Sequence, residues 1–261
     1  MASEIKVDTI VNAGGDNDSG IDLATNDNIK FNIAGSQKAI IDSSGNVGIG
    51  TTSPGARLDV TSTDSDAVFL RSSQSTTTNV YITNTNATAD NTANLFFAPA
   101  NNVAGSKISS IAIEDFSTSA NRTADLAFST RKDGTMSEAT RIDSSGNVLV
   151  GRTSTISGGS NSASGAQIGS NGLIQSAVSG DTAISLQRLS DNGDIIQFRK
   201  DTTSVGSIGT GSSRLAIGND DTFLTFAGDL DALYPASSSQ TTPRDNAVDL
   251  GTSGTRFKDL Y

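Results

Sequence analysis

The stretch Ile41-Asp-Ser-Ser-Gly-Asn-Val47 decides the fold, because it returns unchanged as Ile142-Asp-Ser-Ser-Gly-Asn-Val148. The offset of 101 residues continues beyond the motif, where Gly50 is matched by Gly151 and Thr52-Ser53 by Thr153-Ser154. Chance does not produce a match of this length. The motif therefore marks a structural unit that the chain uses twice.

Each motif has the composition of a tight reversal between two strands. An Asp at the first turn position can accept hydrogen bonds from backbone N–H groups two residues on, and a Gly can take the positive φ of the bulge that follows a type I turn. We therefore predict a positive φ at Gly45 and Gly146. We also predict that the carboxylates of Asp42 and Asp143 accept backbone hydrogen bonds at the turns.

A second turn signal precedes each motif, Gly35-Ser36 in the first copy and Asp133-Gly134 in the second. Each copy is thus predicted to be a three-stranded meander, at residues 29–49 and about 126–150. The middle arm covers residues 37–41 in the first copy and 135–142 in the second. This variation in length argues against a solenoid with a fixed period.

The first motif and its surroundings resemble a known group of proteins. Ile41-Asp-Ser-Ser-Gly-Asn-Val-Gly-Ile-Gly-Thr-Thr-Ser-Pro54, followed by Ala56-Arg-Leu-Asp-Val60, is similar to repeats in the tail fibres and other fibrous virion proteins of tailed phages, marine and cyanophage-like phages above all. Residues 3–11 and 245–261 resemble the same group. Similar repeats also occur in spikes and in bacterial surface proteins, so the resemblance indicates a type of fibrous protein and not one specific function.

The resemblance implies an intertwined parallel homotrimer located in the virion. It also implies an N-terminal segment, residues 1–30, that joins other virion proteins. Members of the group often continue beyond a segment like Phe257-Lys-Asp-Leu-Tyr261, some of them into a C-terminal chaperone domain that directs trimerisation. We therefore expect a processed or truncated chain, or a separate assembly helper.

The composition favours an all-β chain with a thin core. Hydrophobic residues make up 34% and aromatic residues 5%, and there is no Trp, His or Cys. Ile, Val and Thr recur in short alternating runs between tracts of Ser, Asn and Gly, which is typical of strands separated by turns. The sequence predicts an elongated fibrous array of short strands and hairpins, with at most one or two turns of helix.

The pattern along the chain divides it into seven ranges. They are an anchoring segment (1–30), a first meander (31–60), a strand array (61–125), a second meander (126–153), a Gly/Ser-rich linker or turns (154–182), a hairpin region (183–228) and a C-terminal β segment (229–261). Within the array, short strands are predicted at residues 68–70, 80–82, 95–97 and 108–113. In the hairpin region, residues 184–189 and 195–199 are predicted to flank a turn, and residues 200–209 resemble a third, degraded copy of the motif.

Association is expected to be part of folding. So few large apolar residues cannot offset an ordering cost of roughly 1.5 kcal/mol per residue in a single chain. In a trimer the alternating apolar positions face a shared axis and neighbouring chains cover open strand edges. Ile41, Val47, Ile142 and Val148 are therefore expected to be buried by neighbouring chains, and Val148→Asp is expected to impair assembly.

Several classes of function are disfavoured by the sequence. A net charge of −10 repels a phosphate backbone, so nucleic acid is not an expected partner. No run is long enough to span a membrane, and the N-terminus lacks the apolar core of a signal peptide, so we expect a soluble chain made in the host cytoplasm. Residues 16–20 begin like a calcium loop but lack the later bidentate Glu, so a polar turn is the favoured interpretation.

Catalysis is not expected either, and no catalytic, cofactor-binding or metal-binding residue is assigned. The acidic pairs Glu114-Asp115 and Asp220-Asp221 are adjacent in sequence, so in a strand their side chains would point to opposite faces. There is no His to act as a general base, and no Gly-x-Ser-x-Gly elbow.

Recognition of a receptor or polysaccharide remains an alternative role. Carbohydrate platforms use exposed aromatic residues, and the candidates here are Tyr81, Phe96, Phe97, Tyr234 and Phe257. Packing is the favoured interpretation for each of them. The polar loops at residues 79–102 or 229–244 are the other candidates for receptor contact.

The expected function is therefore that of a non-enzymatic virion fibre or appendage, similar to a tail fibre, that presents a host-recognition tip. The alternatives are a carbohydrate-binding or depolymerising spike, a bacterial adhesin and a capsid decoration fibre. The sequence leaves open whether a fibre would sit on the tail, the neck or the capsid, and which receptor it would touch.

Overall fold

The computed structural model describes residues 9–11, 20–23, 27–63, 68, 70, 79–156, 164–211, 213–237, 242–245, 247–249 and 251–255. This part of the chain is all-β, as predicted, with one short 3₁₀ turn, η1 (Ser119–Asn121). The chain divides into two compact units, Met1–Tyr81 and Ile82–Tyr261.

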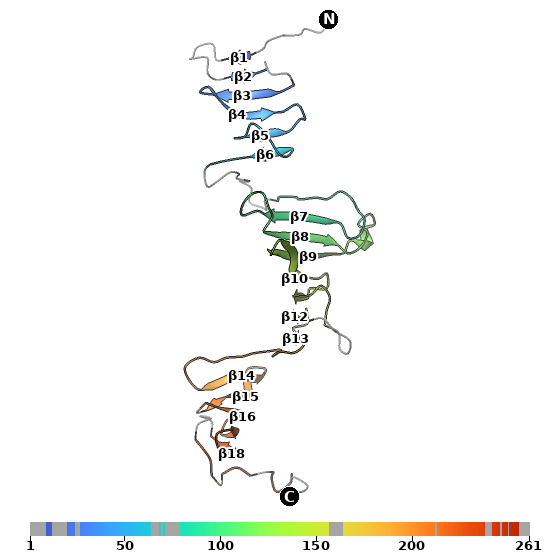
Figure 1. The fold of residues 1–261 in the computed structure, drawn as a ribbon. Helices are drawn as coiled ribbons and strands as arrows, with labels where there is room; N and C mark the ends of the chain where they lie inside the picture. The colour runs from blue at the N-terminus through green and yellow to red at the C-terminus, as the bar shows by residue number, and fades with distance from the viewer. Residues whose placement is uncertain are drawn as a thin grey trace. The chain divides into compact units, whose positions relative to one another are not determined.

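The first unit contains one sheet of six strands in sequence order (Figure 1). The strands are β1 (Thr9–Val11), β2 (Gly20–Asp22), β3 (Ile29–Ile33), β4 (Ser36–Ile41), β5 (Val47–Ile49) and β6 (Leu58–Val60). Neighbouring strands are antiparallel except for β5 and β6, which are parallel.

The second unit contains two antiparallel sheets, of seven and five strands, again in sequence order. The seven strands are β7 (Thr92–Phe97), β8 (Ser106–Ala112), β9 (Ala124–Lys132), β10 (Thr135–Ile142), β11 (Val148–Val150), β12 (Gly165–Ile168) and β13 (Ile174–Ala177). The five are β14 (Gly193–Lys200), β15 (Thr203–Gly211), β16 (Arg214–Asn219), β17 (Thr222–Ala227) and β18 (Ala232–Ala236).

Both predicted meanders are present, as β3-β4-β5 and β9-β10-β11. Each has a bulge at the same distance before the motif, where Lys38 in the first copy and Ala139 in the second has no cross-strand partner. The carbonyl of this residue accepts a hydrogen bond of 2.9 Å from the N–H of Gly50 or Gly151. The glycine that follows the motif therefore closes the bulge in both copies.

The paired parts of the first two strands of the second meander are each longer than their counterparts in the first meander, and by the same number of residues. In the first, residues Ile29–Ile33 pair with the six residues of β4, and in the second, residues 126–132 pair with the eight residues of β10. Each arm of the second meander is thus two residues longer. Side chains alternate between faces along a strand, so a change of two residues keeps every position on its original face.

The chain takes different paths after the two motifs. After β5 it returns as the parallel strand β6, and the N–H of Thr61 donates to the carbonyl of Ile49 at 2.9 Å. After β11 it returns as the antiparallel strand β12. An ideal Cβ on Gly50 would clash with the carbonyl oxygen of Thr61, whereas one on Gly151 would meet nothing nearer than 4.0 Å.

Three sequence predictions of strands are wrong. Residues 184–189 form no strand, and β14 instead pairs with β15 through a turn at Asp201 and Thr202. That two-residue connection, with φ of 54° at Asp201, does not share the geometry of the repeated motif.

Residues 80–82 are also not a strand, and neither Val68 nor Leu70 lies in one. Conversely, β12 and β13 lie in the range predicted to be linker or turns.

Extensive contacts among the described strands occur only between hydrogen-bonded neighbours, so each sheet is a single layer. Within the described residues, the buried hydrophobic side chains are few and mostly small: Ile40, Ala127, Leu149, Ala216, Phe223, Ala227 and Ala236. Within each unit, the described strands form no stacked layers of the kind that normally supplies a β core.

Candidate association surface

The repeated turns have the predicted chemistry. Gly45 and Gly146 have φ of 76° and 83°. One carboxylate oxygen of Asp42 accepts the N–H groups of Ser44 and Asn46, each at 2.9 Å. In the second copy the corresponding oxygen of Asp143 accepts from Ser145 and Asn147 at 3.0 and 2.9 Å.

These hydrogen bonds favour the ionised carboxylate. The backbone N–H of Asn46, followed by the Asn46 side chain, the Ser44 N–H and the charge of Arg57, outweighs desolvation and lowers the pKa of Asp42. At Asp143 burial alone would raise the pKa, but the hydrogen bonds from Asn147 and Ser145 prevail, so the pKa lies below its usual value. Both turns therefore carry a negative charge at neutral pH.

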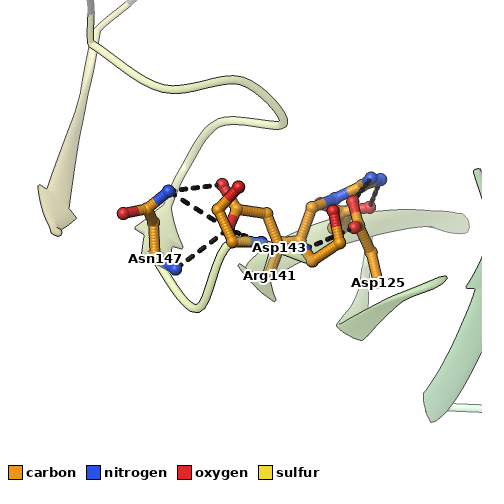
Figure 2. A network of polar contacts seen from close by, with 7 residues as sticks. Asp125, Arg141, Asp143 and Asn147 are labelled. Carbon is orange, nitrogen blue, oxygen red and sulfur yellow. Dashed lines mark hydrogen bonds and ion pairs between the residues drawn. The ribbon is translucent and has the colours of Figure 1, made fainter. Parts of the chain in front are cut away.

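A polar network ties the second turn to the sheet (Figure 2). Arg141 on β10 donates to Asp125 on β9 at 2.6 Å and makes two bonds of 2.8 Å to Glu138. The other oxygen of Asp125 accepts the N–H of Ser144, in the turn, at 2.8 Å. The Glu138 hydrogen bonds, then those of Asp125, outweigh desolvation and raise the pKa of Arg141, which stays charged.

This network lies on one face of the seven-stranded sheet, together with a cross-strand row of Ala127, Arg141, Leu149 and Gln167. Leu149 is fully buried and Asp125 is only 7% exposed. Long polar side chains thus cover small and apolar ones on this face. It needs no second layer to be protected from water.

The opposite face of the same sheet is apolar and open. One cross-strand row contains Leu126, Ile142, Val148, Ile168 and Ile174. The exposed fraction rises along this row to 52% at Ile168 and 70% at Ile174. A parallel row adds further apolar residues: Leu95, Ile108, Phe128 and Val150.

The sheet of the first unit has the same organisation. Its apolar face has a row of Ile29, Ile41, Val47 and Leu58. A second row consists of Ile10, Ile21, Phe31, Ala39, Ile49 and Val60. Ile41 and Val47 thus occupy the same face, and the same mutual pairing, as Ile142 and Val148 in the second copy.

The five-stranded sheet repeats the pattern. Its open face has one row of Ile196, Ile208, Ile217, Leu224 and Pro235, and another that includes Leu215, Phe226 and Leu233. On the other face Ala216 and Thr225 are fully buried beside Tyr234, over which Arg214 stacks at 5.9 Å. We name the open apolar faces of the three sheets, defined by these rows, the association surface.

Exposed apolar rows on this scale mark interaction sites. Four of these residues, Ile41, Val47, Ile142 and Val148, are those that the sequence analysis expects neighbouring chains to bury. It did not single out the rows of the five-stranded sheet, although the strict alternation of Phe223, Thr225 and Ala227 with Leu224 and Phe226 contains the signal.

The other sequence candidates are scattered. Tyr81, Phe96 and Phe97 are 84%, 54% and 49% exposed, so packing within the chain does not account for them. Tyr234 packs against the small core of Ala216, Phe223 and Ala236. Phe257 and most of the calcium-loop-like stretch at 16–20 lie outside the described residues.

In the first acidic pair each carboxylate has its own hydrogen-bond donor. Glu114 accepts the hydroxyl of Thr123 at 2.5 Å, and Asp115 accepts the N–H of Ser117 at 2.7 Å. Hydrogen bonds from the Ser117 side chain and N–H lower the pKa of Asp115, the opposite of what a general acid requires. Asp220 and Asp221 lie at the turn between β16 and β17.

Comparison with models of protein families gives no match, and comparison with curated proteins gives none either. The part of the chain that the structure describes contains no helix with the length and hydropathy to span a membrane. Within the same residues, no three His, Cys, Asp or Glu side chains are grouped as metal ligands.

Proposed function

We propose that this protein is a structural subunit of a virion fibre or appendage, assembled as an elongated, intertwined parallel homotrimer. The observation that carries the proposal is the association surface: each of the three single-layer sheets has one open face with apolar rows that run across its strands. An open apolar face has a large free energy to gain from being covered, about 25 cal/mol per Å².

The same cross-strand pairing of apolar residues in both copies of the motif supports a parallel arrangement of identical chains. If copies align in register, each apolar row meets the same row of its neighbours, and like residues pack in successive layers. The charged and hydrogen-bonded faces then point to solvent, where Arg141 and its carboxylates lose no hydration. The resemblance of the motif to phage fibre repeats supports three chains and a location in the virion.

Ile168→Asp tests the assembly. Within one chain this side chain is half exposed, so a carboxylate there has little direct cost. In a trimer three carboxylates would be buried and close together, which is strongly unfavourable. Ser145→Asp is the matched control, because it adds the same charge at an exposed turn.

Sedimentation equilibrium measures the result. The expected mass for the unchanged protein and for Ser145→Asp is three times 26.7 kDa, with Ile168→Asp dissociated. A folded monomer or a dimer for the unchanged protein would contradict the trimer. Immunogold imaging then tests the location: label on phage particles supports a virion fibre, whereas label on bacterial cells alone supports an adhesin.

A further inference from the structure

A pocket within the second unit has features of a ligand site that the proposed structural role does not use. It lies between the start of β7, the end of β8, residues 84–87 before β7 and residues 116–122 after β8. Its volume is about 440 Å³, within the range of about 300–1,000 Å³ typical of small-molecule pockets.

Hydrogen bonds hold the two walls of the pocket in place. The N–H of Phe116 donates to the carbonyl of Ala87 at 2.7 Å, which joins one wall to the other. The side-chain amide of Asn84 donates to the carbonyl of Thr92 on β7 at 3.3 Å, and the N–H of Ala112 donates to the carbonyl of Asn91 at 2.9 Å. A ligand would therefore meet walls that are already ordered, which lowers the entropic cost of binding.

The lining offers unused hydrogen-bonding groups of both kinds. Asn86 uses its oxygen to accept the N–H and hydroxyl of Thr88, and among the described residues its amide nitrogen has no partner. Asn91 donates its amide to Thr88, and its oxygen is likewise unpaired within the described part of the chain. Donors and acceptors in one pocket match sugar hydroxyl groups, which both donate and accept.

One cation completes the site. Arg122 lines the pocket, and its Nε donates to the carbonyl of Phe116 at 3.2 Å, which fixes the side chain at one nitrogen. Its two terminal nitrogens make no hydrogen bond to any residue that the structure describes. The lining contains no carboxylate, and the half-buried Phe116 adds an apolar surface for a sugar ring. A fork of two guanidinium donors is the natural partner of a carboxylate.

We propose that this pocket binds a saccharide unit that bears one carboxylate, of the uronic acid type. Arg122 binds the carboxylate, and Asn86 and Asn91 bind hydroxyl groups. The net charge of −10 on the whole chain disfavours long polyanions, so a single acidic sugar fits better than a highly charged polymer.

The test compares the binding of galacturonate and galactose to the intact protein by calorimetry and saturation-transfer NMR. The carboxylate is expected to make galacturonate bind about tenfold more tightly or better, since hydrogen bonds between charged groups are the strong ones. Arg122→Gln should remove this preference. Equal binding of the two sugars would refute the acidic class, and no binding of either would refute the site.

A second variant guards against loss of structure. Asn86→Asp keeps the oxygen atoms that accept from Thr88, so the loop remains hydrogen-bonded, but it replaces a donor by a negative charge. It should abolish galacturonate binding, whereas Asn219→Asp, an exposed change on β16, should not. Sedimentation of the same samples keeps the two proposals separate, because a trimer without sugar binding refutes only the pocket. Equal loss of binding in both variants would refute the specific role of Asn86.

Discussion

Replacing Arg141 by leucine is expected to open the centre of the seven-stranded sheet. The change places an apolar side chain in the row and removes the partner of two carboxylates. Asp125, which is 7% exposed, keeps one hydrogen bond, from the N–H of Ser144. Glu138, whose side chain is 18% exposed, loses both of its bonds to the guanidinium.

Stranding a buried carboxylate typically costs 3–5 kcal/mol. The sheet is a single layer and water is near, so we take the lower end, about 3 kcal/mol. This corresponds to an increase of about 100-fold in the rate of exchange through local opening. Hydrogen exchange of peptides from β9 and β10 measures the effect directly, with peptides from β16 and β17 as the internal reference.

The second substitution Asp125→Asn, made in the Arg141→Leu background, tests the cause. It removes the stranded charge and keeps an oxygen that can accept from Ser144. The double variant should therefore be more protected than Arg141→Leu alone, because contacting residues are not additive. The reasoning is refuted if Arg141→Leu exchanges less than about threefold faster than the unchanged protein, or if the second change brings no recovery.

Three further outcomes are expected. Leu149→Ala, at a fully buried position, should lower the free energy of unfolding in urea by about 2 kcal/mol or more, and a smaller loss would mean that the sheet closes around the gap. Gly50→Ala should be far more destabilising in thermal melts than Gly151→Ala, since both require a positive φ but only the first meets a backbone oxygen; equal losses would contradict this. The pKa values of Asp42 and Asp143 lie below 3.8 in the folded chain. The two turns should therefore keep their full stability above the pKa of the unfolded chain and lose it as the pH falls through the pKa of the folded chain. Carboxyl chemical shifts that titrate above 3.8 would exclude this.

Local chemistry explains what could be predicted. The turns at Gly45 and Gly146 follow from four residues whose preferences agree, and the meanders follow from turns placed at both ends of apolar alternation. The failed hairpin at residues 184–189 shows the limit of this method. The alternation of apolar and polar residues at 184–189 is typical of a strand. A strand also needs a neighbour to pair with, and β14, the expected neighbour, pairs with β15 instead.

Other features depend on register and so are invisible in the sequence. The bulges fall on Lys38 and Ala139, which share no chemistry, because the bulge is imposed by the pairing of the strands and not by the side chain. Asp125 and Arg141 are 16 residues apart, and only the paired strands bring them together. The sequence shows that Asp125 is acidic, but it does not show that Arg141 is its partner.

The matched lengthening of the two meander arms limits how such a chain can change. A single inserted residue would turn the rest of its strand over, placing charged side chains on the apolar rows and apolar ones among the charges. Two residues in one arm would leave two unpaired positions, whereas two in each arm widen the sheet and leave its faces as they were. Evolution can therefore lengthen this meander only by insertions of two residues that occur in both paired arms.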